Sequence, residues 1–448
     1  MVSIYKAKAK AQGPQHLTLT VERWDHEAQS IAYHEGKICF IEGALPGETV
    51  KVKLSEQKPQ YNKGKVQSVV SASSLRIKPA CPMSGQCGGC QLHFIGASDA
   101  VQLKQQAVAQ LLAHQLKLTD LPWQPAIVGA DAGYRRKARI GIWYEKSTKQ
   151  FQVGFRKEHS NEILDVSDCM VLSPVIAKVL SVLAKTLPTL KHGAVITHAE
   201  VFDADGQAYV IVRHIKELSD SDKSLLQQSW PEAYWYGEAE PDVLSAWQID
   251  TPEPSYTLAL PAATPTTLRL AFKAGDFIQV NAVVNQQMVQ QAVQWLAPTA
   301  ADRILDLYCG IGNFSLALAA TGAQVFGLEG VPAMVQRARL NASANNLTRC
   351  EFAHVDLHLP WPVAAWNKPV YQKVLLDPAR AGAPGAIDEI ARLKPAQILY
   401  VSCNPTTFTR DAKVLLAKGY RIAKIGVMDM FPYTSHLELM ALFDKVRQ

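Results

Sequence analysis

The sequence predicts an α/β protein whose C-terminal third is a doubly wound parallel sheet, preceded by a small β-barrel and a middle α+β domain. From residue 298 onward, short apolar runs alternate with helical segments, which is the pattern of strand–helix–strand units. These runs end in polar side chains, at the edge where open α/β sheets hold their ligands. The earlier residues form short alternating runs broken by Gly and Pro, typical of antiparallel sheets.

Length and composition fit a soluble multidomain protein. The chain has 448 residues, is 48% hydrophobic and 19% charged, and carries a formal net charge of +6. It is too long for one core, and its mildly basic charge is compatible with a polyanionic partner. Residues 1–10 lack the apolar core of a secretory signal, and no apolar run is long enough to cross a bilayer. We therefore expect a cytoplasmic protein, and a monomer.

Residues 1–72 are expected to form the small β domain. The stretches 16–21 and 48–54 alternate between apolar and polar residues, as half-buried strands do. Four lysines fall on strand-like segments, so one sheet face could be basic: Lys51, Lys53, Lys63 and Lys65. This is either an ordinary solvated face or a nucleic-acid platform of oligonucleotide-binding-barrel type, with Tyr33, Phe40 or Tyr61 available for stacking.

The middle domain, residues 73–272, opens with a cysteine cluster. Cys81, Cys87 and Cys90 lie in one glycine-rich stretch, and clustered thiols in a reducing compartment indicate metal binding or catalysis. Zinc usually takes paired C-x₂-C knuckles, whereas an iron–sulfur cluster takes four thiolates with looser spacing. Cys169, in a polar turn, is the natural fourth ligand. We therefore favour a closed four-cysteine [4Fe–4S] cluster over zinc.

The middle domain also contains a cationic strand pattern. A helix is expected from residue 98 to 115, and residues 134–142 and 151–157 alternate as strands. The first strand places Arg135, Lys137 and Arg139 on one face, which is either an RNA-binding surface or an ordinary charged solvent face. Residues 217–267 are rich in Pro, Ser and Asp and receive no role.

Residues 273–448 carry a nucleotide-binding pattern. Asp306 ends a buried run, Gly310 and Gly312 follow it, and Glu329 ends the next run. A glycine-rich turn followed by an acid about 20 residues later suits a ribose-bearing ligand. The third glycine of a dinucleotide site is missing, and an acid at the first strand end would repel a pyrophosphate. It suits a cationic, amine-bearing ligand instead, and the pattern resembles S-adenosylmethionine methyltransferases.

Cys403 is the candidate nucleophile. It follows the buried run 398–401 and precedes Pro405, which suits the first turn of a helix. A free cysteine at a strand end is often an inert packing residue, and Glu438 alone would be assigned to the surface. A thiolate, however, is both a strong nucleophile and an acceptable leaving group. A nearby carboxylate such as Glu438 could act as the base.

Several motifs resemble known families. The lysine-rich strands and the Gly-Ala-Leu-Pro-Gly-Glu turn at residues 43–48 resemble the TRAM domain of RNA-modifying enzymes. Five further motifs are Phe-Ile-Gln-Val-Asn (277–281), Asp-Leu-Tyr-Cys-Gly-x-Gly (306–312), Asp-Pro-x-Arg (377–380), Ser-Cys-Asn-Pro (402–405) and His-Leu-Glu (436–438). In this order they resemble the RNA uracil-5 methyltransferase family. With the cysteine cluster the likeness covers essentially the whole chain, and it is greatest to members acting on 23S ribosomal RNA.

The resemblance implies an activity and a set of site residues. The activity is S-adenosyl-L-methionine-dependent methylation of carbon 5 of a uridine in 23S ribosomal RNA. The implied residues are Cys403 as nucleophile and Glu438 as base; Gln279, Tyr308, Asn313, Glu329, Asp356 and Asp377 at the S-adenosylmethionine site; and Cys81, Cys87, Cys90 and Cys169 as [4Fe–4S] ligands. Ala379 stands where the family usually has a second proline, and we expect a slightly more flexible loop there.

Three classes of alternative remain beside this interpretation: related uracil-5 methyltransferases with other substrates, RNA cytosine-5 methyltransferases and a non-catalytic factor. A tRNA-directed relative is expected to lack both the cysteine cluster and the TRAM domain, and another ribosomal relative lacks only the latter. RNA cytosine-5 methyltransferases carry a second cysteine on the neighbouring strand, where this chain has Asp377 and Pro378. A non-catalytic RNA-binding assembly factor is the third, and the complete set of candidate residues argues against it.

Overall fold

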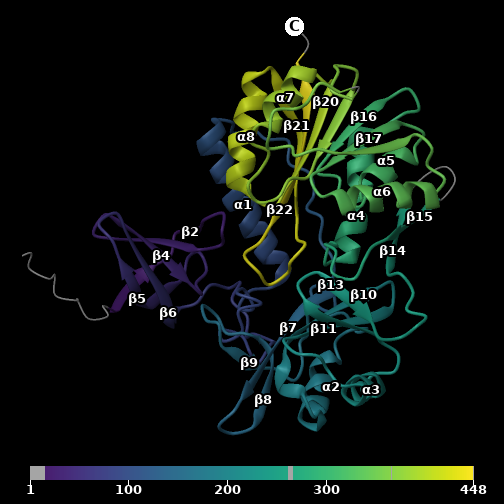
Figure 1. The fold of residues 1–448 in the computed structure, drawn as a ribbon. Helices are drawn as coiled ribbons and strands as arrows, with labels where there is room; N and C mark the ends of the chain where they lie inside the picture. Colours follow the sequence, from purple (N-terminus) through teal and green to yellow (C-terminus); the bar gives the residue numbers. More distant parts are fainter. Residues whose placement is uncertain (1–15, 261–265, 365, 447–448) are drawn as a thin grey trace, which may run out of the picture. The chain divides into compact units, whose positions relative to one another are not determined.

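The computed structural model describes residues 16–260, 266–364 and 366–446 (Figure 1). The expectation drawn from residues 1–10 lies outside the described residues. The chain divides into two compact units, one of residues 1–80 and 91–111 and one of residues 81–90 and 112–448. Among the described helices, none is long and apolar enough to span a membrane.

The first unit contains a six-stranded sheet. Its strands are β1 (His16–Thr20), β2 (Arg23–Trp24), β3 (Ser30–His34), β4 (Lys37–Glu42), β5 (Thr49–Gln57) and β6 (Tyr61–Ser71), in the order β1-β5-β6-β4-β3-β2. Val50, Val52 and Leu54 of β5 are buried and alternate with exposed residues, as predicted for a half-buried strand. Helix α1 (Ala97–Leu116) begins in this unit, one residue before the predicted start.

The turn between β4 and β5 has a clear physical basis. Gly43 and Gly47 have positive φ angles of 89° and 82°, which glycine adopts without steric cost. The fully buried Glu48 carboxylate accepts the Leu45 backbone N–H at 2.8 Å and the Arg76 guanidinium Nη2 at 2.6 Å. These contacts satisfy a charge that would be costly to bury alone.

The second unit begins with a seven-stranded sheet. Its strands are β7 (Lys137–Glu145), β8 (Gln150–Arg156), β9 (Ile163–Asp165), β10 (Ile196–Ala204), β11 (Gln207–His214), β12 (Tyr234–Glu240) and β13 (Val243–Ala246), in the order β13-β12-β11-β10-β7-β8-β9. Helices α2 (Val179–Thr186) and α3 (Asp220–Ser229), with short 3₁₀ turns at Leu187–Thr189 and Gly193–Val195, accompany it. A hairpin of β14 (Ser255–Leu260) and β15 (Thr266–Ala271) follows.

The C-terminal sheet has the order β18-β17-β16-β19-β20-β22-β21. Its strands are β16 (Arg303–Leu307), β17 (Gln324–Glu329), β18 (Cys350–His354), β19 (Lys373–Leu376), β20 (Gln397–Ser402), β21 (Tyr420–Met428) and β22 (Glu438–Lys445). Helices α4 (Ala282–Leu296), α5 (Ser315–Ala319) and α6 (Pro332–Ala344) cover one face, and α7 (Ala386–Leu393) and α8 (Pro405–Ala417) cover the other (Figure 1).

One strand of this sheet departs from the predicted parallel arrangement. Strand β22 runs antiparallel to both β20 and β21 and lies between them, so the sheet is mixed. Residues 122–127 also lie along the β21 edge, where Gln124 N–H donates to the Ile425 carbonyl at 2.7 Å and Ile127 N–H to the Val427 carbonyl at 2.9 Å. This added edge segment was not predicted.

Candidate active site

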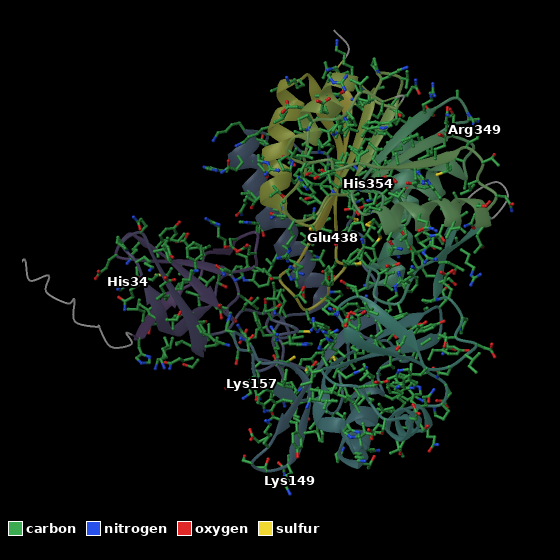
Figure 2. All side chains as sticks on the ribbon, in the orientation of Figure 1. His34, Lys149, Lys157, Arg349, His354 and Glu438 are labelled. Atoms are coloured by element: carbon green, nitrogen blue, oxygen red, sulfur yellow. The ribbon has the colours of Figure 1, made fainter. Side chains whose placement is uncertain are left out.

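The strand register brings Cys403 and Glu438 together. Ser402 at the end of β20 pairs with Leu439 of β22, so the next position in the antiparallel register places Cys403 opposite Glu438. Directly opposed residues have Cα atoms roughly 4.5–5.5 Å apart. Glu438 is only 7% exposed at the start of β22 (Figure 2), whereas Cys403 is partly accessible. A thiol and a buried carboxyl group therefore share the carboxyl end of the sheet.

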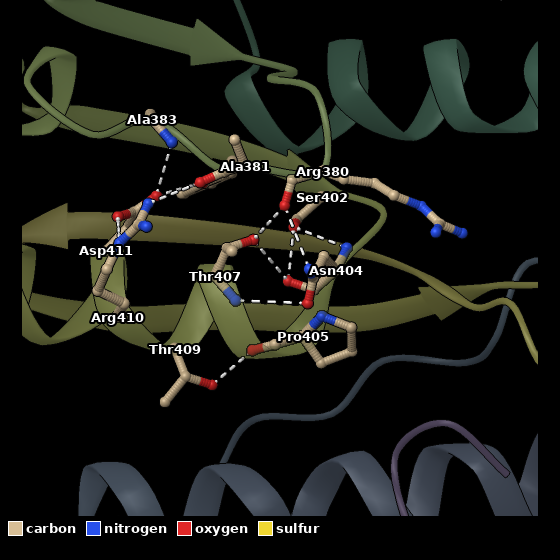
Figure 3. Close-up of polar contacts among 11 residues, drawn as sticks. Arg380, Ala381, Ala383, Ser402, Asn404, Pro405, Thr407, Thr409, Arg410 and Asp411 are labelled. Atoms are coloured by element: carbon tan, nitrogen blue, oxygen red, sulfur yellow. Dashed lines mark hydrogen bonds and ion pairs between the residues drawn. The ribbon is translucent and has the colours of Figure 1, made fainter. Parts of the chain in front are cut away.

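The loop around Cys403 is fixed by hydrogen bonds (Figure 3). Asn404 caps helix α8, because its side-chain oxygen accepts the Thr406 backbone N–H at 3.0 Å. Its amide nitrogen donates to the Arg380 carbonyl at 3.2 Å, and the Ser402 hydroxyl accepts the Asn404 N–H at 3.2 Å. These contacts leave little freedom for the backbone on either side of the thiol.

The loop of residues 377–385 is anchored to helix α8. The buried Asp411 carboxylate accepts the Ala383 N–H at 2.8 Å and the Tyr400 hydroxyl at 2.7 Å. Arg410 donates to the Ala381 carbonyl at 2.9 Å (Figure 3). Sequence reasoning missed Asp411, since nothing in its local pattern marks a mid-helix aspartate as a loop anchor.

The acidic groups of the site have pKa values displaced toward neutral pH. Burial, and after it the Asp377 carboxylate, raises the pKa of Glu438 to about 8. Burial raises the pKa of Asp377 to about 7. The pKa of the Cys403 thiol is raised by burial and then by Glu438 and Asp377, while Arg380 opposes that shift. Carboxyl groups with displaced pKa values beside a thiol are typical of an active site.

The glycine-rich turn after β16 is built for a ligand. Tyr308 has a φ of 61°, a left-handed conformation that costs a bulky residue energy and concentrates at functional sites. Glu329 accepts the Gly310 N–H at 3.0 Å and so ties β17 to the turn. At Gly312, a φ of 96° makes any other residue strained, and a Cβ atom would lie 2.3 Å from the end of the Leu316 side chain.

Two buried polar atoms in the described part of the turn lack partners. Asp306 is fully buried and accepts a hydrogen bond from Ser315 through Oδ2, but its Oδ1 atom is unsatisfied, as is the Tyr308 hydroxyl. Burial raises the pKa of Asp306 to about 7. An unpaired carboxylate oxygen and a phenol hydroxyl fit a ligand with amino and hydroxyl groups, such as S-adenosylmethionine.

The other predicted cofactor residues occupy different environments. Asn313 Oδ1 accepts the Tyr256 hydroxyl at 2.9 Å, and Asn313 Nδ2 donates to Asn285 Oδ1 at 2.9 Å. The Gln279 carbonyl accepts Arg136 Nε at 2.7 Å. Asp356 is exposed and accepts the His358 N–H at 2.9 Å. Tyr256 and Asn285 were missed, because their contacts with Asn313 cross between separate elements.

The structure also brings the four predicted cysteine ligands together. Cys81, Cys87, Cys90 and Cys169 are free and partly accessible. Burial, and after it the thiols of Cys169, Cys87 and Cys81, raises the pKa of Cys90 to about 12. Burial also raises the pKa of Cys169, and the Cys87 and Cys81 thiols add to that shift. The four thiols therefore influence one another's titration, as the side chains of one shared site do.

A backbone donor also lies close to one of these thiols. Gly89 N–H points at the Cys87 sulfur at 3.4 Å, a contact that stabilises a thiolate.

Fold and site together define a methyltransferase-type α/β domain with a cysteine nucleophile candidate. The tRNA (Uracil-5-)-methyltransferase family model matches residues 263–357 and 366–446, and the TRAM domain model matches residues 14–67. A tRNA (uracil-54, C5)-methyltransferase from Pyrococcus abyssi, solved with S-adenosyl-L-homocysteine, aligns with a TM-score of 0.71, covering 95% of this chain and all of that one at 22% identity. That likeness confirms the fold.

Full-length relatives identify the family. The chain is 39% identical to the 23S rRNA (uracil(1939)-C(5))-methyltransferase RlmD of Vibrio parahaemolyticus, over 99% of this chain and 100% of the relative. It is 40% identical to RlmD of Shewanella piezotolerans, over 99% of each. The chain belongs to the RlmD family of RNA (uracil-C5)-methyltransferases, which confirms the predicted resemblance.

Proposed function

We propose that the protein transfers a methyl group from S-adenosyl-L-methionine to carbon 5 of one uridine of 23S ribosomal RNA, and that this is uridine 1939, the position in the names of its relatives. The observation that carries the proposal is the register that sets Cys403 against Glu438 beside the acidic turn of β16. A ribosomal RNA substrate would place the reaction in the cytoplasm, and we propose that the enzyme acts as a monomer.

The two side chains have complementary tasks. Carbon 5 of uracil is a poor nucleophile, so the Cys403 thiolate first adds to carbon 6 and converts the ring to an enolate. S-adenosylmethionine would supply the methyl group to carbon 5, with cleavage of its sulfonium–methyl bond and release of S-adenosylhomocysteine. Glu438, once ionised, removes the proton left on carbon 5, and the electron pair of the carbon–hydrogen bond expels the Cys403 thiolate. The free enzyme is regenerated with 5-methyluridine as product.

We further propose a ligand for each set of predicted site residues. Asp306 Oδ1 and the Tyr308 hydroxyl would meet the amino and hydroxyl groups of S-adenosylmethionine, with Gln279, Asn313, Glu329, Asp356 and Asp377 around them. Cys81, Cys87, Cys90 and Cys169 would hold a [4Fe–4S] cluster with no open iron position, so its role would be structural. Residues 1–72 and 73–272 would bind RNA, and residues 273–448 would carry out catalysis.

A trapping experiment tests the nucleophile. In the presence of S-adenosylmethionine, a 23S RNA fragment containing 5-fluorouridine at the target should form a denaturant-stable complex with the wild-type protein, because after methyl transfer carbon 5 carries fluorine in place of the proton that elimination removes. Cys403→Ala should form none, whereas Cys39→Ser, a cysteine buried in the first unit, should behave as wild type. Equal trapping by Cys403→Ala and wild type would reject Cys403.

A mass-spectrometric map of ribosomal RNA tests the substrate. Deleting the gene should remove one 5-methyluridine from 23S RNA and leave that of tRNA unchanged. Disappearance of a tRNA methyl group with an intact 23S map would instead favour the tRNA-directed activity of the Pyrococcus relative.

A further inference from the structure

Residues 131–136 contact three parts of the proposed site. Their backbone lies along the turn that carries Cys169, where Gly133 N–H donates to the Met170 carbonyl at 2.9 Å and Arg135 N–H to the Val171 carbonyl at 2.8 Å. On the cofactor side, Arg136 N–H donates to the Val280 carbonyl at 2.8 Å. The buried Arg136 guanidinium also donates to the Gln279 carbonyl and stacks over the Tyr256 ring at 4.6 Å.

The same segment is fastened to the loop that leads into Glu438. The buried Tyr134 hydroxyl donates to the Pro432 carbonyl at 3.0 Å. The Tyr433 hydroxyl donates to Asp131 Oδ2 at 2.7 Å. These two phenol hydrogen bonds connect residues that are 298 and 302 positions apart in the chain. Their C-terminal partners, Pro432 and Tyr433, lie within six sequence positions of Glu438.

The loop itself requires outside support. Tyr433 has a φ of 64°, which is unfavourable for an aromatic residue and persists only where surrounding contacts impose it. Within the loop, Thr434 contributes a turn through its hydroxyl, which donates to the Phe431 carbonyl at 2.8 Å. The hydrogen bond to Asp131 is therefore made by the residue whose backbone conformation is unfavourable.

The cysteine site acts electrostatically on both phenols. Burial, followed by the Cys90 thiol, raises the pKa of Tyr134. For Tyr433, burial and Asp131 raise the pKa, and Cys90 adds to the shift. The turn that carries Cys169 is therefore hydrogen-bonded to the backbone of residues 131–136, and the Cys90 thiol acts electrostatically on both phenols.

We infer that Tyr134 and Tyr433 are positioning residues through which the four-cysteine site sets the placement of Glu438. The inference rests on the proposed function, since it gives the cluster a task in that reaction: holding residues 131–136 so that the base meets carbon 5. The inference predicts different effects on two steps of the reaction, because addition of Cys403 does not require Glu438 whereas elimination does.

The first test measures the covalent adduct on ordinary uridine RNA. Full-length protein purified without air is mixed with S-adenosylmethionine and a 23S fragment, and denaturant-stable protein–RNA complex and released 5-methyluridine are followed in time. Tyr134→Phe and Tyr433→Phe each remove one hydroxyl. Tyr420→Phe is the matched control, because its buried hydroxyl donates to the Pro395 carbonyl at 2.9 Å at the far end of β21.

We expect adduct to accumulate in the two test variants and not in the control. Elimination should slow about fivefold in each, the rate equivalent of one neutral hydrogen bond, while adduct formation and iron content stay at wild-type values. Glu438→Gln should accumulate the most adduct. Wild-type elimination in Tyr134→Phe and Tyr433→Phe, or slowing confined to adduct formation, would overturn the inference.

The second test measures the local stability of the loop independently of enzymatic activity. Hydrogen exchange of the backbone amides of residues 429–437 should be about tenfold faster in Cys169→Ser than in wild type or in Cys39→Ser, because local opening of a less firmly held loop costs less free energy. Wild-type protein before and after iron chelation provides the same comparison if the variant folds poorly. Unchanged exchange in both comparisons would overturn the inference. If wild type itself forms no 5-methyluridine, the proposed function fails first, and the inference with it.

Discussion

Glu438 is protonated in the ligand-free enzyme at neutral pH, because burial and the neighbouring Asp377 raise its pKa to about 8. A base must lose that proton before it can take another from carbon 5. The same displaced pKa makes the group a stronger base once ionised, since proton affinity rises with pKa. The residue therefore combines a low population of the active form near pH 7 with high reactivity of that form.

The first prediction concerns the pH dependence of elimination. Its rate in single-turnover experiments should rise with pH through the Glu438 pKa of about 8 and level off about one pH unit above it, where Glu438 is ionised. Glu438→Gln should be slower by about 10²-fold or more, the usual contribution of a general base, and should lose this pH dependence. A wild-type rate that is flat between about pH 6 and about pH 9 would contradict the assignment.

The second prediction concerns stability. Asp306, Asp377 and Glu438 all have raised folded-state pKa values, of about 7, 7 and 8. Between the unfolded value near pH 4 and these values, the folded state binds more protons than the unfolded state, so the free energy of unfolding falls as pH rises. Urea midpoints of the ligand-free protein should decrease from about pH 5 to about pH 8, and Asp377→Asn should decrease less steeply.

At the scale of single elements, the turn from β20 into α8 sets the direction of the thiol. The cap by Asn404 and the contacts of Ser402 and Arg380 fix the chain on both sides of Cys403 (Figure 3). The buried strand before it supplies the rigid support, since Ile398, Leu399 and Tyr400 are fully buried. The position of the Cys403 thiol thus depends on neighbouring residues that take no part in the reaction.

The third prediction tests this support. Asn404→Ala removes the side-chain acceptor of the Thr406 N–H and the donor to the Arg380 carbonyl. The free energy of unfolding should fall by about 1 kcal/mol, the usual cost of losing a helix N-cap, and trapping by 5-fluorouridine RNA should slow. Asn404→Ser, which retains a capping oxygen, should recover most of the stability. Full trapping speed in Asn404→Ala would show that the cap does not position the thiol.

Local patterns predicted the elements well and their long-range partners poorly. The buried run at 303–307 is strand β16, and the helix expected at 98–115 is Ala97–Leu116, since periodicity is a local signal. The insertion of β22, the Tyr134–Pro432 contact and the Asn285–Asn313 pair depend on residues far apart in sequence. Composition and residue spacing do not reveal which distant residues pair. The expected flexibility at Ala379 remains a prediction.

At the scale of the whole molecule, the first unit offers the basic face that the sequence predicted. Lys51, Lys53, Lys63 and Lys65 are all exposed, and Lys53 is the cross-strand partner of Lys65. Tyr61 lies beside this face, with the Lys63 ammonium 5.6 Å from its ring, which suits base stacking.

The fourth prediction follows from that face. Replacing the four lysines with Gln should weaken binding of a 23S fragment and reduce the slope of log affinity against log salt by roughly 0.7 for each phosphate that is no longer neutralised. Replacing them with Arg should preserve both quantities, because the charge remains. Filter binding at several salt concentrations measures the slope. An unchanged slope in the Gln variant would assign this face to solvent.

The placement of β22 also affects how the protein can fold. This strand follows every other strand of its sheet in the chain, yet it pairs with β20 on one side and β21 on the other. Until it inserts, two apolar strand edges are open, a condition that favours association between partly folded chains. The strand that closes those edges begins with Glu438. A chain trapped before this insertion would be prone to aggregate and would also lack its base, so protection from aggregation and completion of the active site are one folding event.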